Sequence, residues 1–305
     1  IYGYYASSSS FYKQEVIGNS ISNLTTPSAS YGVYVTGGQN DSCIIDSNII
    51  TNLNTTSTVL PFIYGIYISN VIKCLIRDNI VSNLGSYYTA GIRLFYSSYN
   101  PSIEILRNKI YSLSSGASSS SGSTLNGIYV NDNGRPGFIK IHNNLIGLLT
   151  APVCTSTNAI TALETSCSGL TDSLIIDIAH NTIYLDASSS TSTNFGTSGI
   201  HQNSSSNGNY ERFIFRNNIV VNLSTPKGTG TTVAFRRNST NNSNYDARSN
   251  RNVYYSGIPS STHLLFTNGT SSYFTLSGYK TYIATSVPTA ERNSFTENVA
   301  FQSIV

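Results

Sequence analysis

Histidine and arginine side chains are the residues of this sequence best suited to chemistry. His201 lies in GIHQ (199–202), Arg236 and Arg237 end TVAFRR (232–237), and Arg93 lies in GIRL (91–94). An imidazole can act as a general base, and a neighbouring guanidinium stabilises the anion that proton abstraction creates. No residue in the sequence is placed to orient His201, so a solvated histidine and a basic turn are the simpler interpretation. These four residues are weak catalytic candidates.

A repeated phrase determines where these residues lie. The segments CIIDSNIITNL (43–53) and CLIRDNIVSNL (74–84) share their apolar positions, an asparagine and a cysteine. The phrase recurs at intervals of 29 to 37 residues, which is the size of a solenoid repeat. Its central asparagines are Asn19, Asn48, Asn79, Asn108, Asn144, Asn181 and Asn218, with a degraded copy at Asn252.

Each repeat holds about three short strands. Apolar residues alternate with polar ones on both sides of the asparagine and in a second phrase, such as GVYV (32–35) or GIYI (65–68). This period of two is typical of strands with one buried face. No helical periodicity intervenes, and no tight hairpin turn joins these strands. The pattern predicts a single all-β domain, a parallel β-helix of about eight rungs over residues 1–255, closed by residues 256–305.

The asparagine column has an architectural interpretation. Asparagine tolerates the left-handed backbone conformation that a sharp bend between strands requires. Its side-chain amide can also hydrogen-bond to the same residue on the next rung, so stacked asparagines form a ladder. We therefore expect the asparagines to be structural.

The sequence resembles the right-handed parallel β-helix repeat proteins of the pectin-lyase-like superfold. The resemblance rests on IIDSNII (44–50) followed by YGIYI (64–68), on IRDNIV (76–81) with AGIRL (90–94), and on FRNNIV (215–220). The end of the chain, residues 273–303, is similar to the closing tail of secreted or cell-surface proteins of Bacteroidetes type. The superfold hosts lyases, hydrolases, tailspikes and adhesins, so the resemblance implies a fold more than a function. A right-handed coil follows from the resemblance and from the general rule for parallel connections.

In the enzymes of that superfold, the substrate lies along the face formed here by the second phrase. Four of its eight outward positions are expected to be tyrosines, which would suit the apolar faces of sugars or a protein partner, or would simply stack on one another. These outward positions are Tyr5, Tyr34, Tyr67, Arg93, Tyr129, Thr161, His201 and Ala234.

A catalytic constellation is hard to assemble on this face. A hydrolase needs two facing carboxylates, and calcium needs several oxygen ligands together. The chain has only 14 acidic residues, and none is expected on this face. No Cys/His spacing is typical of zinc. The sequence therefore predicts no metal and no cofactor.

The four cysteines form two pairs with different environments. Cys154 and Cys167 flank one predicted strand, and a disulfide between them is favoured in an oxidising compartment. Cys43 and Cys74 occupy the same inward position on adjacent rungs, at a spacing that permits a disulfide. An inward cysteine also serves as a small apolar side chain, so this second pairing is left open.

Other outward residues suggest ladders and covered surfaces. Charged residues share one outward position on three rungs (Glu104, Lys140, Asp177) and another on two (Asp46, Arg77), which indicates pairing between rungs.

Apolar side chains also point outward on the strand after the asparagine, and either another segment or another chain would cover them. These are Ile49, Ile80, Leu145, Ile219 and Val221.

Composition narrows the function classes. Charged residues make up 10% of the chain, the formal net charge is +3, and there is no basic run, so no nucleic-acid partner is expected. No apolar stretch is long enough to span a bilayer. The chain begins inside a strand-like phrase and reads as a piece of a longer protein. We expect an extracellular or cell-surface stalk or adhesin that contacts a glycan or protein surface, or a self-assembling fibre subunit. The alternative is a polysaccharide lyase or hydrolase, or a glycan-binding module derived from one.

Overall fold

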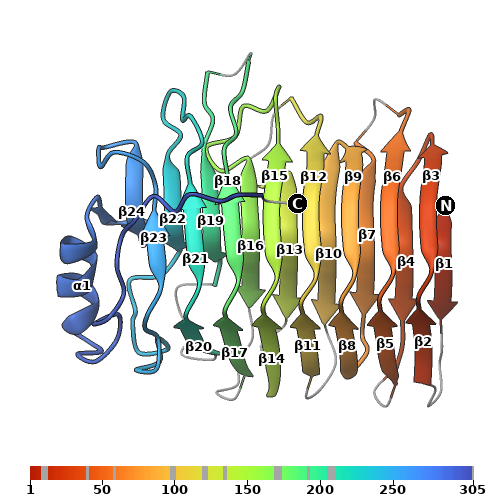
Figure 1. The fold of residues 1–305 in the computed structure, drawn as a ribbon, viewed down its shortest axis with the longest axis horizontal. Coiled ribbons are helices and arrows are strands. Elements are labelled where there is room, and N and C mark those ends of the chain that lie inside the picture. The colour runs from red at the N-terminus through yellow and green to blue at the C-terminus, as the bar shows by residue number, and fades with distance from the viewer. Residues whose placement is uncertain are drawn as a thin grey trace.

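The computed structural model shows a parallel β-helix, as predicted (Figure 1). It describes residues 1–7, 13–38, 41–57, 60–96, 101–118, 123–132, 136–167, 174–190, 193–204 and 211–303. Over this part of the chain the strands form three sheets of ten, seven and eight strands, here called sheets A, B and C. From β1 to β22, successive strands along the chain pass from A to B to C and back to A, so one circuit makes one rung.

The strands of each sheet follow chain order, and all pairings except β24 with β25 are parallel. Sheet A contains β1 (Tyr2–Ser7), β4 (Ser30–Thr36), β7 (Phe62–Ser69), β10 (Tyr88–Tyr96), β13 (Leu125–Asp132), β16 (Ile160–Cys167), β19 (Thr197–Gln202), β22 (Thr232–Arg237), β24 (His263–Thr267) and β25 (Ser272–Tyr273). Sheet B contains β2 (Lys13–Ile17), β5 (Ser42–Asp46), β8 (Lys73–Arg77), β11 (Ser102–Leu106), β14 (Gly137–His142), β17 (Leu174–Ala179) and β20 (Glu211–Arg216). Sheet C contains β3 (Ser20–Thr26), β6 (Ile49–Thr55), β9 (Ile80–Ser86), β12 (Lys109–Ser115), β15 (Leu145–Thr150), β18 (Thr182–Leu185), β21 (Ile219–Asn222) and β23 (Val253–Tyr255).

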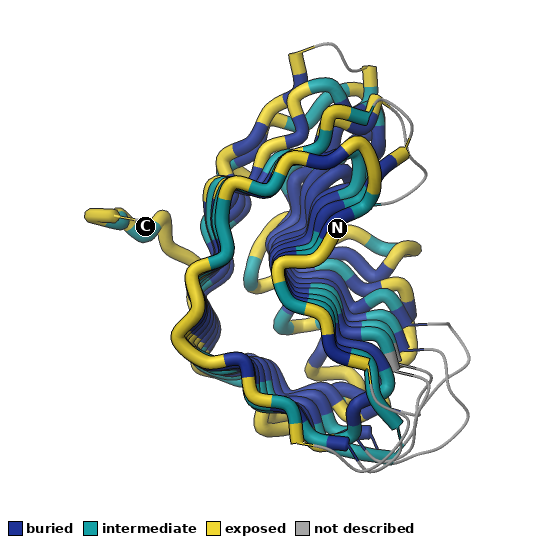
Figure 2. Tube along the Cα trace, turned by 90° about the vertical axis from the view of Figure 1, so that its right-hand side faces the viewer, coloured by how far each residue is buried: buried dark blue, intermediate teal, exposed yellow. Residues whose placement is uncertain are grey.

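The core is a set of stacked apolar columns. Ile45, Ile76 and Ile105 are register partners on three successive strands of sheet B, and none has any exposed surface. Figure 2 looks along the stack and shows successive rungs lying one behind another, with buried positions on the strands of every sheet. Because each inward residue packs against its equivalent on the next rung, one alternating phrase specifies the whole core.

The turn between sheets B and C corrects one part of the asparagine interpretation. The left-handed residue is the one before each asparagine, with φ of 56° at Ser47, 54° at Arg107 and 58° at His180. The asparagine itself is not in that conformation. The sequence pattern missed this because several residue types fill the preceding position, so it shows no column.

The asparagine ladder itself is confirmed. The side-chain amide of each central asparagine donates to the Oδ1 atom of the next, over distances of 2.9 to 3.0 Å from Asn19 through Asn252. The same Oδ1 atoms accept the backbone N–H of the preceding rung's asparagine. The ladder satisfies the polar groups that the bend buries, which is the requirement for any buried backbone turn.

The C-terminal residues pack against the last rungs of the β-helix. The helix α1 (Leu276–Ala284) packs Tyr279 against Phe266 of β24 at 4.4 Å between ring centroids. Glu291 is fully buried and accepts hydrogen bonds from Asn252 and from the hydroxyls of Tyr245 and Tyr254. Burial raises the pKa of Glu291. This carboxyl ends the asparagine ladder.

Within the part of the chain that the structure describes, no helix is long and apolar enough to cross a membrane.

The outward apolar residues of sheet C differ in how far they are buried. Val221 is fully buried, and its register partner Tyr184 contacts Phe301 of the C-terminal segment at 5.4 Å between ring centroids. Figure 1 shows this segment crossing sheet C in front of β21 and β18. Ile80, Leu145 and Ile219 are half-buried. Ile49, near the other end of the sheet, is 45% exposed. The segment therefore covers one end of this face.

The disulfide pairing differs from the favoured expectation. Cys43 and Cys74 are bonded across adjacent rungs, with their Cα atoms 4.6 Å apart. Cys154 and Cys167 are buried and not joined to each other, so that predicted bond is wrong. Cys154 accepts a hydrogen bond from Thr124, just before β13, whereas Cys167 pairs with Asp132 at the far end of that strand. An extended strand of this length, rising about 3.3 Å per residue, keeps the two thiols near opposite ends of the strand.

Candidate functional site

The outward column of sheet A differs from the predicted one at two rungs. Strand pairing places Glu164 beside Tyr129, and Arg236 beside His201. Thr161 and Ala234 do not belong to this column, so those two assignments are wrong. Ala162 and Ala234 take the position that glycine holds on the other rungs, such as Gly127 and Gly199. Because the sequence analysis used this glycine to align the strands, alanine in its place led to a wrong alignment on these two rungs. The observed column is Tyr5, Tyr34, Tyr67, Arg93, Tyr129, Glu164, His201 and Arg236.

The first half of this face is a tyrosine platform, defined here as Tyr2, Tyr5, Tyr31, Tyr34, Tyr64 and Tyr67. Tyr34 stacks on Tyr5 at 5.2 Å and on Tyr67 at 5.1 Å between ring centroids. A second ladder, of Tyr2, Tyr31 and Tyr64, runs beside the first, and Tyr31 meets Tyr34 edge-on at 4.8 Å. The sequence analysis missed this second ladder because its tyrosines precede the glycine rather than follow it. Its signal is a tyrosine one position before the glycine in YGVYV (31–35) and YGIYI (64–68).

Arg93 belongs to this aromatic surface. Its guanidinium carbon lies 4.6 Å from the ring centroid of Tyr129 and 5.0 Å from that of Tyr64. A guanidinium held between two rings is stabilised by cation–π attraction. Arg93 therefore has a structural partner on each side, and its position extends the tyrosine platform towards Tyr129.

The second half of the face carries a carboxylate beside a histidine. Glu164 and His201 are 6% and 5% exposed, and the Oε1 and Nδ1 atoms are 3.8 Å apart. Glu164 corrects the expectation that no acidic residue lies on this face. Asn126 donates to its Oε2 atom and Asn203 to its Oε1 atom, each at 2.9 Å. The Nε2 atom of His201 lies 3.0 Å from Oδ1 of Asn238.

Burial dominates the electrostatics of this pair. It lowers the pKa of His201, although Glu164 and the bond to Asn238 oppose that shift. The imidazole is therefore neutral at pH 7. Both oxygens of Glu164 are engaged by amides, and the structure brings no second carboxylate to the column among the residues it describes. The pair has the elements of an acid–base couple, but both partners are engaged by asparagine side chains.

The two consecutive arginines lie on opposite faces of sheet A. Arg237 is fully buried, and oxygens of Gln202, Asn242, Asn241 and Asn244 accept its N–H groups. It is a structural residue of the closing rungs, and its full burial rules out the catalytic role considered for it. Arg236 is partly buried and faces outward. Its Nε atom donates to Ser198 at 2.8 Å and a terminal nitrogen to Thr231 at 3.0 Å.

Strand pairing confirms the predicted register of both charge ladders on sheet B, although Asp177 takes different ion-pair partners. Lys140 pairs with Glu104 at 3.3 Å, and Arg77 with Asp46 at 2.6 Å. Asp177 is a register partner of Lys140 but bonds to Arg216 at 2.7 Å and lies 3.4 Å from His142. Burial raises the pKa of Asp177, but the neighbouring His142 and the hydrogen-bonded Arg216 outweigh it and lower the value to about 2. These pairs join rungs, as surface ladders do.

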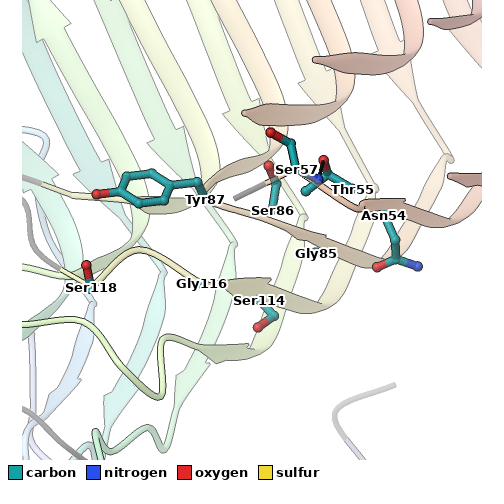
Figure 3. A pocket seen from close by; sticks show the side chains of 9 residues that line it. All are labelled: Asn54, Thr55, Ser57, Gly85, Ser86, Tyr87, Ser114, Gly116 and Ser118. Carbon is teal, nitrogen blue, oxygen red and sulfur yellow. Dashed lines mark hydrogen bonds between the residues drawn. The ribbon is translucent and has the colours of Figure 1, made fainter. Parts of the chain in front are cut away.

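A groove lies where sheet C turns towards sheet A (Figure 3). Its volume is about 550 Å³. Register places Asn54, Gly85 and Ser114 side by side on three rungs, and the missing side chain of Gly85 leaves the hollow. A Cβ atom at Gly85 would stand 2.8 Å from Oδ1 of Asn54. Figure 3 shows Tyr87 lying along one side. The lining residues carry no charge.

Glu211 is a buried carboxyl outside the site, and it supports a prediction about stability. Burial raises its pKa to about 7 from the usual 4.5. The folded protein therefore binds the proton more tightly than the unfolded chain. The neutral carboxyl of Glu211 therefore stabilises the folded protein, and this stabilisation is complete below about pH 4.5. It is lost as the pH rises through about 7, which lowers the free energy of unfolding by roughly 3 kcal/mol.

We expect Glu211→Gln to abolish this loss. Urea denaturation should show the stability difference between variant and wild type growing by about 3 kcal/mol from pH 4.5 to pH 8 in favour of the variant. Glu104→Gln, at a half-buried surface position, is the matched control and should show no such growth. A difference for Glu211→Gln that stays constant with pH would contradict the assigned shift.

Comparison of the chain with protein-family models, with curated proteins and with solved structures returned no match. The geometry of sheet A is therefore the basis for any statement about function.

Proposed function

We propose that this chain is a non-catalytic β-helical stalk or adhesin module of an extracellular or cell-surface protein, and that it binds carbohydrate along the tyrosine platform. The observation that supports the proposal is the pair of adjoining tyrosine ladders on the parallel strands β1, β4 and β7. Membership of the pectin-lyase-like superfold is part of the same proposal, supported by the stacked parallel sheets and the repeat phrase.

The platform has the properties that sugar rings require. A pyranose has apolar C–H faces and a hydroxyl rim, and tyrosine offers an apolar ring with a polar tip. Tyr2 and Tyr5 are 47% and 52% exposed, and Tyr34 and Tyr67 are half-buried, so the rings are accessible yet held. Their neighbours on adjacent rungs restrict the rotamers before any ligand arrives. A surface ordered in advance loses less entropy on binding.

A polysaccharide lyase or hydrolase is the second candidate, and the Glu164–His201 pair is the observation that favours it. A buried carboxylate beside an imidazole is a combination that acid–base catalysis uses. Against this, a hydrolase needs two carboxylates at the scissile bond. The binding proposal requires no residue beyond those observed on the platform.

The test is glycan-array binding of the chain beside the double variant Tyr34→Ala/Tyr67→Ala. Removing two central aromatic anchors should weaken binding at least tenfold, since each such anchor contributes about 2 kcal/mol. Tyr111→Ala, a half-buried outward tyrosine on sheet C, is the matched control and should bind normally. Ultraviolet absorbance of unsaturated products is followed on the same glycans. Unchanged binding by the double variant would sink the proposal, and new absorbance would favour the lyase.

A further inference from the structure

Within the residues that the structure describes, only two hydrogen-bond donors of the Arg236 guanidinium have partners. An arginine side chain carries five N–H donors, and the two donors of Arg236 with partners give their hydrogen bonds to the neutral hydroxyls of Ser198 and Thr231. Ser198 in turn donates to Oδ1 of Asn158 at 2.7 Å, which fixes the hydroxyl that accepts from Nε. One side of the guanidinium is thus anchored, and its remaining donors have no hydrogen-bond partner among the described residues.

No carboxylate among the described residues lies within ion-pair distance of Arg236. The nearest in the column, Glu164, is two strands away with His201 between them, and amides occupy both its oxygens. Burial lowers the pKa of Arg236 to about 10, with Glu164 opposing the shift. The positive charge is therefore partly desolvated and has no direct counter-charge, which is costly unless an anion completes the site.

Other arginines of the described chain show what Arg236 lacks. Arg77, Arg107 and Arg216 each contact a carboxylate oxygen at 2.6 to 2.7 Å on a neighbouring rung. Arg93 is held between two rings, and Arg237 has four oxygen acceptors. Arg236 combines partial burial, an outward position and neutral partners. The planar guanidinium of an arginine can donate two parallel hydrogen bonds to two oxygens of one carboxylate or sulfate group.

We propose that Arg236, anchored by Ser198 and Thr231, binds a single carboxylate or sulfate group on a glycan that lies along sheet A. This inference rests on the proposed function and names the class of its ligand, an acidic glycan. Five strand spacings separate Tyr67 on β7 from Arg236 on β22, about 24 Å at roughly 4.8 Å each. One extended chain of several sugars can therefore contact the tyrosine platform and Arg236 together.

The experiment compares three probes that share one backbone: cello-oligosaccharides, the same oligomers oxidised to glucuronate at C6, and the same oligomers sulfated at C6. Affinities are measured by calorimetry for the wild type, Arg236→Gln and the control Arg77→Gln, which removes the same charge from sheet B. At least one anionic probe should bind the wild type about tenfold or more tightly than the neutral oligomer, as charge-assisted hydrogen bonds predict. The better of the two anionic probes identifies the group.

Arg236→Gln should abolish this preference and leave the affinity for the neutral oligomer unchanged, whereas Arg77→Gln should preserve the preference. Equal affinity of the wild type for all three probes would overturn the inference, as would an equal loss by Arg236→Gln on every probe. Failure of the proposed function looks different. In that case Tyr34→Ala/Tyr67→Ala would bind every probe like the wild type, while any preference that depends on Arg236 would persist.

Discussion

Replacing Ile76 with aspartate is expected to unfold the β-helix. Ile76 has no exposed surface, and its register partners above and below are Ile45 and Ile105. The new carboxyl would sit in an apolar column without a hydrogen-bond partner, either charged at great cost or neutral and still unsatisfied. We expect a loss of more than about 4 kcal/mol, measured by circular dichroism during urea denaturation.

Two control variants test whether the effect of Ile76→Asp comes from a buried charge rather than from a smaller side chain or from the charge alone. Ile76→Val removes one methylene group and should cost about 1 kcal/mol. Ile49→Asp places the same charge on the outward face of sheet C, where the side chain is 45% exposed, and should cost less than about 1 kcal/mol. Hydrogen exchange should show the damage of Ile76→Asp beginning in β5, β8 and β11, because rungs support only their neighbours. Normal folding of Ile76→Asp would show that the inward register is wrong.

Replacing Asn108 with leucine is expected to have the second largest effect. Its Oδ1 atom accepts two hydrogen bonds from Asn79, and its Nδ2 atom donates to Asn144 and to the carbonyl of Ile76. Leucine removes all four bonds and leaves buried groups on both neighbouring rungs unsatisfied. At about 1 to 3 kcal/mol for each stranded group, the loss should reach about 4 kcal/mol in the same denaturation assay.

Asn108→Gly distinguishes the two explanations of the asparagine column. If the column served a left-handed backbone, glycine would adopt that conformation freely and the variant would be stable. Since the left-handed residue is Arg107, with φ of 54°, we expect Asn108→Gly to be as unstable as Asn108→Leu. Asn54→Leu, at an exposed position on sheet C, is the matched control and should change stability by less than about 0.5 kcal/mol.

The sequence predicted the fold because the information is local and repeated. An alternating phrase identifies the inward face, and each column needs only its own equivalent on the next rung. The asparagine ladder followed for the same reason, as did the pairing of Asp46 with Arg77. The first tyrosine ladder was predicted at rungs whose glycine marks the register.

Only the tertiary structure decided the features that depend on register across variable loops or on segments outside the repeat. The sequence put Thr161 and Ala234 in the outward column in place of Glu164 and Arg236, because alanine stands where other rungs have glycine and the phrase was aligned out of register on both rungs. Arg236 and Arg237 are adjacent in sequence, yet one faces solvent and the other the core. The repeat placed Cys43 and Cys74 within bonding distance but left their pairing open, and the structure shows the bond. The contact of Phe301 with Tyr184 involves a segment outside the repeat, which no phrase of the repeat places.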